Sequence, residues 1–467
     1  MGMDLSTLLA VEENGGKFYN HGTPGNAMEI LQGYGMNLVR LRIWNDPFDE
    51  KGTSYGAGGC DIETVLALAK RAKRLGIGWL LDFHYSDFWA DPGKQWVPKA
   101  WRGMNALELE QAIYDYTTEV LDRCGKEDVV PQMVAVGNEL SNGFLWPLGQ
   151  LPHGGSWKRL LEKKQSRSAV INEQSPGVVA NEQSRKDVVE DQSQSNGMDE
   201  EREISPEGVR LSDAYKNVAA FVNAGIRAVR DFEARMNAGM KGGNLYSAAE
   251  PDLQDPEMSS ADGAKPDSAK TGACKLPVMI HLDAGGDNEL YRRWFDHYFA
   301  NGGEDFEYIG LSYYPFWHGT LDKLQYNMND IARRYGKKLI MAEVSMGFTM
   351  EDYASYERLM PSERKGMATK PDAVARVPYP MTPQGQADFM RDAIEVVRQV
   401  PDGLGCGFIY WEPAWIPVPN VGWANAASCE YIHDPGLYGN EWANQALFDY
   451  EGNALPALGV IGKYARK

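Results

Sequence analysis

Short apolar runs alternate along this chain with stretches whose apolar residues recur at helical spacing, and this alternation restricts the fold more than any other feature. Strands separated by helices form βαβ units and a parallel sheet. Eight such units close into a (β/α)8 TIM barrel, an α/β fold that we predict here. The expected strands are Met1–Leu5, Leu38–Ile43, Trp79–Phe83, Met133–Val136, Val278–Leu282, Tyr308–Ser312, Leu339–Ala342 and Gly407–Tyr410. The expected helices are Ile62–Leu75, Leu107–Arg123, Asp213–Met236, Tyr291–Phe299, Leu321–Tyr335 and Gln384–Val400.

An open, doubly wound sheet is the alternative fold. It usually carries a glycine-rich phosphate loop after its first strand, and none follows Met1–Leu5. Two segments of low complexity, Lys163–Pro206 and Ala238–Ala273, interrupt the connection between the fourth and fifth strands, and their composition is typical of surface insertions. We therefore expect one catalytic domain over residues 1–467 with insertions at 163–206 and 238–273. A passive role and a regulatory or binding role both stay open for them.

The composition restricts the partners of the chain. A net charge of −18 argues against nucleic acid or an anionic membrane, because phosphate attraction needs a basic surface. It fits a neutral ligand, and we expect a monomer. The 13 Trp and 23 Tyr residues suit sugars, whose faces are partly apolar, although barrel cores also use aromatics. No apolar stretch approaches the roughly 20 residues of a membrane span.

Five cysteines are scattered without a C-x-x-C pair. Their odd number and spacing predict reduced thiols and no zinc site, with one disulfide between Cys406 and Cys429 as the alternative. No signal peptide precedes Met1. We expect a cytoplasmic protein if the chain is complete, and a secreted or cell-surface protein if an export signal was trimmed.

Two glutamates stand at the ends of predicted strands. Glu139 closes Val136–Glu139, and Glu343 closes Ile340–Glu343. Active sites of barrel enzymes lie at the strand C-termini, and glycosidic hydrolysis needs two carboxyl groups flanking the bond. We therefore predict a retaining glycosidase, with Glu139 as acid and base and Glu343 as nucleophile, their carboxyl groups about 5–5.5 Å apart.

Polar side chains near these strand ends are candidates for binding the sugar or for hydrogen bonding to the two glutamates. The amide of Asn138 is expected to bond a sugar hydroxyl beside the scissile bond. Arg42 and Tyr313 are the expected hydrogen-bond donors to the nucleophile, although an ion pair between Arg42 and Asp4 is the alternative for that arginine. His84 is expected to bind a sugar hydroxyl, with a structural histidine as its alternative.

Aromatic side chains also cluster at the expected strand ends. Four of them are placed to stack on sugar rings, and the last is the expected floor for the cleaved sugar: Trp89, Trp146, Trp317 and Trp411. Glu412 follows directly and is interpreted as a structural or substrate-orienting carboxylate. Asp4 completes the set of predicted substrate-binding residues.

At these residues the chain resembles the endo-β-1,4-galactanases of glycoside hydrolase family 53. The matching segments are Gly2–Ser6, Val39–Pro47, Asp82–Pro92, Val136–Glu139, Gly310–Gly319, Tyr410–Trp415 and Asn444–Asp449. The resemblance implies endo-hydrolysis of β-1,4-galactan, the side chain of type I arabinogalactan in pectin, with retention and without a required cofactor. Some bacterial members hold a structural calcium ion, for which Asp434 and Asn440 are the candidate ligands here.

The chain departs from the family in Val344–Thr349, which is less aromatic than expected, and in its two insertions. These departures concern product length more than bond type. A β-mannanase or xylanase of the same clan is one alternative function. A non-catalytic carbohydrate-binding barrel is another, but such a protein should lack one of the two glutamates.

Overall fold

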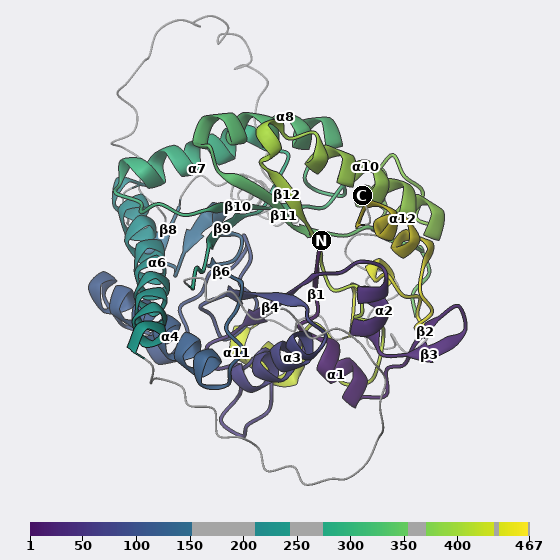
Figure 1. The fold of residues 1–467 in the computed structure, drawn as a ribbon, viewed down its shortest axis with the longest axis horizontal. Helices are drawn as coiled ribbons and strands as arrows, with labels where there is room; N and C mark the ends of the chain where they lie inside the picture. The colour runs from purple at the N-terminus through teal and green to yellow at the C-terminus, as the bar shows by residue number, and fades with distance from the viewer. Residues whose placement is uncertain (152–210, 243–273, 354–369, 434–438, 466–467) are drawn as a thin grey trace, which may run out of the picture.

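Eight parallel strands close into a barrel in a computed structural model that describes residues 1–151, 211–242, 274–353, 370–433 and 439–465 (Figure 1). Around the barrel the strands follow the order of the chain, so each connection joins neighbours. Closure excludes the open doubly wound alternative and confirms the predicted fold. The barrel strands are β1 (Gly2–Asp4), β4 (Leu38–Ile43), β5 (Gly78–Phe83), β6 (Met133–Val136), β9 (Val278–Leu282), β10 (Tyr308–Tyr313), β11 (Lys338–Val344) and β12 (Gly405–Tyr410).

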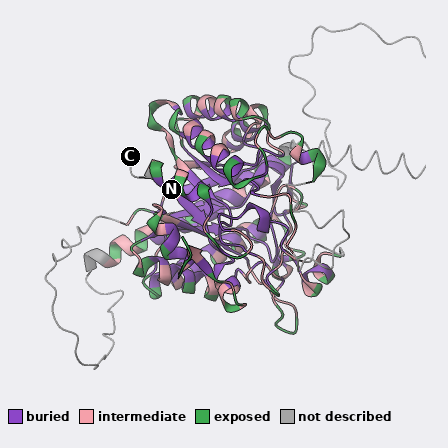
Figure 2. Cartoon of the chain, turned by 90° about the vertical axis from the view of Figure 1, so that its right-hand side faces the viewer, coloured by how far each residue is buried: buried purple, intermediate pink, exposed green. Residues whose placement is uncertain are grey.

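Helices surround the barrel and shield its strands from solvent (Figures 1 and 2). Several begin at side chains that accept hydrogen bonds from the first backbone N–H groups, as Asn105, Asp61 and Thr320 do. The described helices are α1 (Leu8–Glu13), α2 (Ala27–Gly33), α3 (Ile62–Arg74), α4 (Ala106–Lys126), α6 (Leu211–Gly242), α7 (Asn288–Ala300), α8 (Leu321–Tyr335), α9 (Pro371–Val374), α10 (Pro383–Arg398), α11 (Ala426–Ile432) and α12 (Pro456–Ala465).

Two small antiparallel ribbons lie outside the barrel. The first pairs β2 (Phe18–Asn20) with β3 (Thr23–Gly25), and the second pairs β7 (Gly143–Phe144) with β8 (Gly149–Gln150). The second ribbon follows the fourth barrel strand directly. It therefore shapes the loop that carries Glu139.

The second predicted insertion begins later than expected. Helix α6 continues to Gly242, so residues 238–242 are helical and the predicted helix end at Met236 is wrong. Apolar residues become fewer after Met236, although the backbone stays helical to Gly242. The insertion at 163–206 and the rest of the second one, 243–273, lie outside the described residues.

The barrel interior has two layers along its axis. Its lower part is apolar, whereas its mouth holds buried charged groups, among them Arg40 and Asp82. Strand side chains alternate between the two faces, so the residues between the inward positions pack against the helices. The apolar plug consists of Leu80, Met133, Ala135, Met279, Ile340, Ala342 and Ile409.

None of the five cysteines forms a disulfide. The prediction of reduced thiols is therefore confirmed, and Cys406 and Cys429 are not bridged. Among the helices that the structure describes, none has the length and apolar character needed to cross a membrane.

Candidate active site

Glu139 and Glu343 meet at the C-terminal mouth of the barrel. One carboxylate oxygen of each and a ring nitrogen of His281 all lie within 4.8 Å of one another. Both glutamates are buried, with 8% and 5% of their surface exposed. In retaining glycosidases the two carboxyl groups are about 5–5.5 Å apart, whereas inverting enzymes need about 6.5–9.5 Å. The spacing therefore fits direct attack on the sugar by one carboxylate.

A strained turn presents Glu139. Gly137 has a φ of +83°, and a Cβ built on it would lie 2.7 Å from Leu140 Cδ2. Glu139 itself adopts a left-handed conformation with φ 51° and ψ 53°, which a non-glycine residue adopts only at a cost. The chain thereby reverses direction at once after β6, and the carboxyl group stays over the barrel.

A β-bulge turns Glu343 toward the barrel axis. Leu311 pairs with Met341 but Ser312 pairs with Glu343, so Ala342 is an extra residue on β11. Strict alternation would place Glu343 on the outer face, because Ala342 already points into the apolar plug. The bulge changes this direction, as bulges beside active sites often do.

Arg40 joins the pair to the rest of the barrel mouth. Its Nη1 donates to Glu343 Oε1 at 2.8 Å and to Asp4 Oδ2 at 3.0 Å. Its Nη2 donates to Asp82 Oδ2 at 2.7 Å and to Asn138 Oδ1 at 2.8 Å. Asp4 is fully buried by these contacts, so it serves this ion-pair network and does not reach a substrate as predicted.

The environment separates the two carboxyl groups electrostatically. Burial raises the pKa of Glu139 well above its ordinary value, and the charges of Glu343 and Asp283 raise it further. Burial also raises the pKa of Glu343, but the Arg40 guanidinium and the Tyr314 hydroxyl oppose that shift. The two groups are close enough to compete for one proton. No cation is among the groups that shift the pKa of Glu139 within the described residues, so this carboxyl group is favoured to hold the proton.

The predicted contact between Arg42 and Glu343 is wrong. Arg40, two residues earlier on the same inward face of β4, makes that contact. Arg42 Nη1 lies 2.5 Å from Glu412 Oε1 and 3.4 Å from Asp4 Oδ1. The alternative of an ion pair with Asp4 is therefore confirmed, and Glu412 belongs to the same ion-pair network. The alternation of residues along β4 identified the face that points into the barrel. It did not show how far along the barrel axis each guanidinium group lies.

The prediction for Tyr313 is also wrong, by one residue. Its hydroxyl donates to Gly319 O at 2.8 Å, away from the pair. Tyr314 donates to Glu343 Oε2 at 2.7 Å. Ser312 points inward toward Glu139, so alternation turns Tyr313 outward and the next residue inward again.

His84 is fully engaged by the protein. Its Nδ1 accepts from Trp44 Nε1–H and from the backbone N–H of Ala90, at 3.3 and 3.2 Å. Its Nε2 lies 3.1 Å from Asp82 Oδ2. Both ring nitrogens are occupied, which favours the structural alternative over the predicted contact with a sugar hydroxyl.

Asn138 and His281 form a second buried network. Asn138 Nδ2 donates to Ala90 O, and Asn138 Oδ1 accepts from Arg40, each at 2.8 Å. His281 bridges this amide to Ser312 through its two ring nitrogens, both contacts measuring 2.8 Å. The carboxamide is therefore held in one orientation, and its role toward a sugar stays a prediction.

Tryptophans from distant loops form a wall beside the pair. Trp89 stacks on Trp423 with ring centroids 4.2 Å apart, and Trp411 packs edge-on against Trp442 at 4.6 Å. Trp317 joins the wall through Trp442 at 6.0 Å. Trp317 and Trp423 are half-buried, whereas the other four members of the wall are buried. The tryptophan wall consists of Trp89, Trp317, Trp411, Trp415, Trp423 and Trp442.

Trp146 lies outside the tryptophan wall. Its Nε1 donates to Asn142 O at 2.9 Å, and it pairs with Trp96 across a short bridge. It is half-buried, so stacking on a sugar remains a prediction for it. The sequence reasoning missed Trp423 and Trp442, because both lie in long loops without a strand end to mark them.

The candidate calcium ligands do not build a site within the described residues. Asp434 lies outside them. Asn440 is buried, its Nδ2 donating to Trp415 O and its Oδ1 accepting from the backbone N–H of Trp442. Calcium binding by these two residues therefore stays a prediction.

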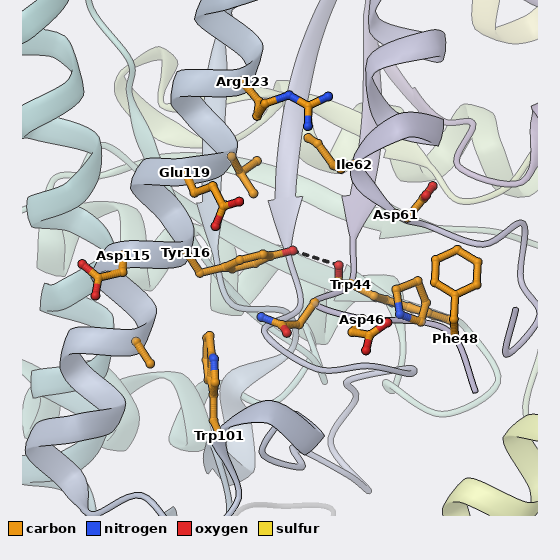
Figure 3. Close-up of a pocket in the computed structure, with 14 residues that line it drawn as sticks. Trp44, Asp46, Phe48, Asp61, Ile62, Trp101, Asp115, Tyr116, Glu119 and Arg123 are labelled. Atoms are coloured by element: carbon orange, nitrogen blue, oxygen red, sulfur yellow. Dashed lines mark hydrogen bonds between the residues drawn. The ribbon is translucent and has the colours of Figure 1, made fainter. Parts of the chain in front are cut away.

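A separate hollow of about 570 Å³ lies on the outside of the barrel, between α4 and the loop after β4 (Figure 3). Tyr116 from α4 crosses it and donates to Trp44 O at 2.8 Å. Trp101 and Glu119 also line it. It contains neither Glu139 nor Glu343.

A (β/α)8 barrel whose mouth holds two facing, buried glutamates at this spacing defines a glycoside hydrolase. The chain belongs to glycosyl hydrolase family 53, whose model matches residues 1–461.

Named relatives extend over almost the whole chain. An endo-β-1,4-galactanase of Bacillus subtilis is 30% identical, covering 98% of this chain and 84% of the relative. A Niallia circulans protein described as uncharacterised is 31% identical over 99% of this chain and 93% of its own length. The solved catalytic domain of family 53 from Ignisphaera aggregans is 29% identical, with a TM-score of 0.70 over 98% of this chain and 94% of that one.

Proposed function

We propose that this protein is an endo-acting, retaining β-1,4-galactanase that cleaves galactan and the galactan chains of type I arabinogalactan. The observation that carries the proposal is the pair Glu139 and Glu343, whose oxygens approach within 4.8 Å in a member of family 53. The Bacillus subtilis relative is an endo-β-1,4-galactanase, which supports galactan as the substrate. A neutral polysaccharide also suits a chain with a net charge of −18.

The reaction proceeds by double displacement. The Glu343 carboxylate attacks the anomeric carbon while Glu139 gives its proton to the departing oxygen, so one C–O bond forms as another breaks. Glu139 then accepts a proton from water, which attacks the galactosyl–enzyme ester and frees Glu343. Arg40 and Tyr314 hold Glu343 ionised for the first step.

Room for sugar on both sides of the pair supports endo action. Most of the tryptophan wall lies on the side of β12 and β5, where Trp411 is the proposed floor for the cleaved sugar, and Trp317 extends it to β10. On the side of β9 and β10 a hollow of about 700 Å³ is lined by Trp317, Asn288 and Tyr326. The Tyr326 ring is 62% exposed. We assign this hollow to sugars of the leaving group.

Product analysis on linear β-1,4-galactan tests the proposal, with mannan and xylan as competing substrates. We expect cleavage of galactan into oligosaccharides and a first-formed product in the β configuration by NMR. An α-configured first product would contradict the role of Glu343. Preference for mannan or xylan would keep the mechanism and change the substrate.

Two variants test the assignment of roles. Glu139→Gln and Glu343→Gln are each expected to lower turnover by several orders of magnitude while galactan binding persists, because the side-chain shapes are kept. Normal turnover in either variant would refute the corresponding role. Loss of both binding and fold, measured by calorimetry and circular dichroism, would show damage and not lost chemistry.

A further inference from the structure

The hydrogen atoms around Glu139 can be placed by following one buried chain of contacts. It starts at Asn138, whose Nδ2 donates to Ala90 O and whose Oδ1 accepts from Arg40. A flipped amide would direct its N–H groups at a guanidinium, which only donates. The oxygen of Asn138 therefore faces His281.

His281 must give a hydrogen to that oxygen. Its Nδ1 lies 2.8 Å from Asn138 Oδ1, which has no hydrogen of its own, so Nδ1 carries one. The ring is fully buried, and burial together with the Arg40 charge lowers the pKa of His281 well below its ordinary value. A neutral imidazole has one N–H, so Nε2 is an acceptor.

The same reasoning about donors and acceptors places the hydrogens on Ser312 and Glu139. Ser312 Oγ lies 2.8 Å from His281 Nε2 and 2.6 Å from Glu139 Oε1. Ser312 has one hydrogen for these two contacts. Both contacts are satisfied at once only when that hydrogen goes to His281 Nε2 and the carboxyl group of Glu139 donates to Ser312 Oγ. We propose that Ser312 and His281 form a polarised relay that holds the acid hydrogen on Glu139 in the free enzyme and reverses at Ser312 when Glu139 gives that hydrogen away.

The relay follows the two half-reactions of the proposed function, on which it rests. When the hydrogen of Glu139 passes to the leaving oxygen, the Ser312 hydroxyl turns to the new carboxylate, and His281 Nε2 loses its donor. A buried acceptor such as His281 Nε2 without a hydrogen-bond donor raises the free energy of this state. A hydrogen taken from the attacking water restores Glu139 and lets Ser312 turn back, so the relay favours the second step.

Other charged or titratable groups also face the relay. Around His281 they lie on or after β4 and β5, and around Glu139 they come from β11 and from the loops after β5 and β9. They are Arg40, Asp82, His84, Glu343, Asp283 and Asp91.

Nitrogen NMR of the full-length protein, labelled with ¹⁵N-histidine, tests the relay without depending on activity. We expect His281 at pH 7 as a neutral ring protonated at Nδ1, with Nε2 shifted by the Ser312 hydrogen bond. Its signal is identified among the 7 histidines from the Ser312→Ala spectrum, where Nε2 loses its donor. A ring protonated at Nε2, or a doubly protonated ring, would overturn the proposal.

Enzyme kinetics give a second test. His281→Leu frees the Ser312 hydrogen to bond the Glu139 carboxylate, so the alkaline limb of kcat/KM should move to lower pH by about one unit, the scale of one charged hydrogen bond. In the Ser312→Ala background the same substitution should leave that limb in place. Equal movement in both backgrounds, or none in either, would refute the relay. Normal turnover of Glu139→Gln would instead refute the acid role itself.

Discussion

At the scale of single residues, two adjacent tyrosines have unrelated tasks. Tyr314 donates to the nucleophile Glu343, whereas Tyr313 donates to the backbone of Gly319. Both rings are buried and both hydroxyls are bonded, so neither composition nor exposure distinguishes them. Only the direction of the strand face does.

Tyr314→Phe is expected to lower kcat about 10- to 150-fold, because a hydrogen bond to a charged group contributes roughly 1.5–3 kcal/mol. Tyr313→Phe is the matched control, since it removes a hydroxyl of the same kind one residue away. We expect its kcat on galactan to stay within about threefold of the wild type. Equal losses in the two variants would mean that Tyr314 does not stabilise the nucleophile.

The sequence pointed to Glu139 and Glu343, which the structure brings together, because each closes an apolar run at the C-terminal end of a strand. The sequence did not identify the side chains that donate hydrogen bonds to these glutamates. Alternation along a strand shows which face of the sheet a side chain is on, but not how deep in the barrel it lies. Arg40 and Arg42 share the inward face of β4, and only the three-dimensional packing shows that the deeper one reaches Glu343. Ser312 and His281 were overlooked as partners of Glu139 for the same reason.

At the scale of elements, two local irregularities aim the catalytic side chains. The turn at Gly137 reverses the chain after β6, and the bulge at Ala342 redirects Glu343 on β11. Apolar patterning predicted the bounds of β4, β6, β9 and α8 as the structure has them. It did not predict the bulge, because an extra residue leaves the apolar pattern of Leu339–Ala342 unchanged.

Gly137→Ala is expected to reduce both stability and turnover. The backbone at φ +83° and the 2.7 Å approach to Leu140 should cost about 1–3 kcal/mol in the free energy of unfolding, and relief of that strain displaces Glu139. Gly76→Ala is the control, because φ there is +67° and nothing lies within 4 Å of the added carbon. Urea unfolding and galactan turnover should show a stability loss in both variants and a loss of turnover only at Gly137.

At the scale of the whole molecule, substrate is expected to extend over both sides of the barrel mouth. Tyr326→Ala should raise KM for galactan about three- to tenfold, as the loss of one aromatic contact does, and shift the cleavage positions in end-labelled galactohexaose. Leu107→Ala, the other strongly exposed apolar side chain among the described residues, is the control. An unchanged cleavage pattern for Tyr326→Ala would remove the leaving-group sugars from that hollow.

The stability of the fold should also respond to pH through one buried acid. Glu441 is 2% exposed, its Oε1 has no hydrogen-bond partner within the described residues, and burial raises its pKa to about 8. The native state therefore holds a proton that the unfolded state releases near 4.5, and native stability falls as pH rises between these values.

Glu441→Gln removes this titration while keeping the shape of the side chain. Its melting temperature should exceed that of the wild type by a margin that grows from pH 4.5 to about pH 8 and is constant above. The exposed Glu451→Gln is the control and should show no such trend. A margin independent of pH would mean that Glu441 is not titrating in the native state.

Arg40 connects the ends of β1, β5 and β6 to β11 through one guanidinium. Synthesis delivers these partners in order, and the nucleophile arrives with the seventh strand of eight. A nascent chain therefore contains Glu139, the proposed proton donor, before Glu343, the proposed nucleophile, has been synthesised. The proposed nucleophile is therefore present only when the barrel is nearly complete, so we expect that a chain ending before β11 cannot cut a glycan.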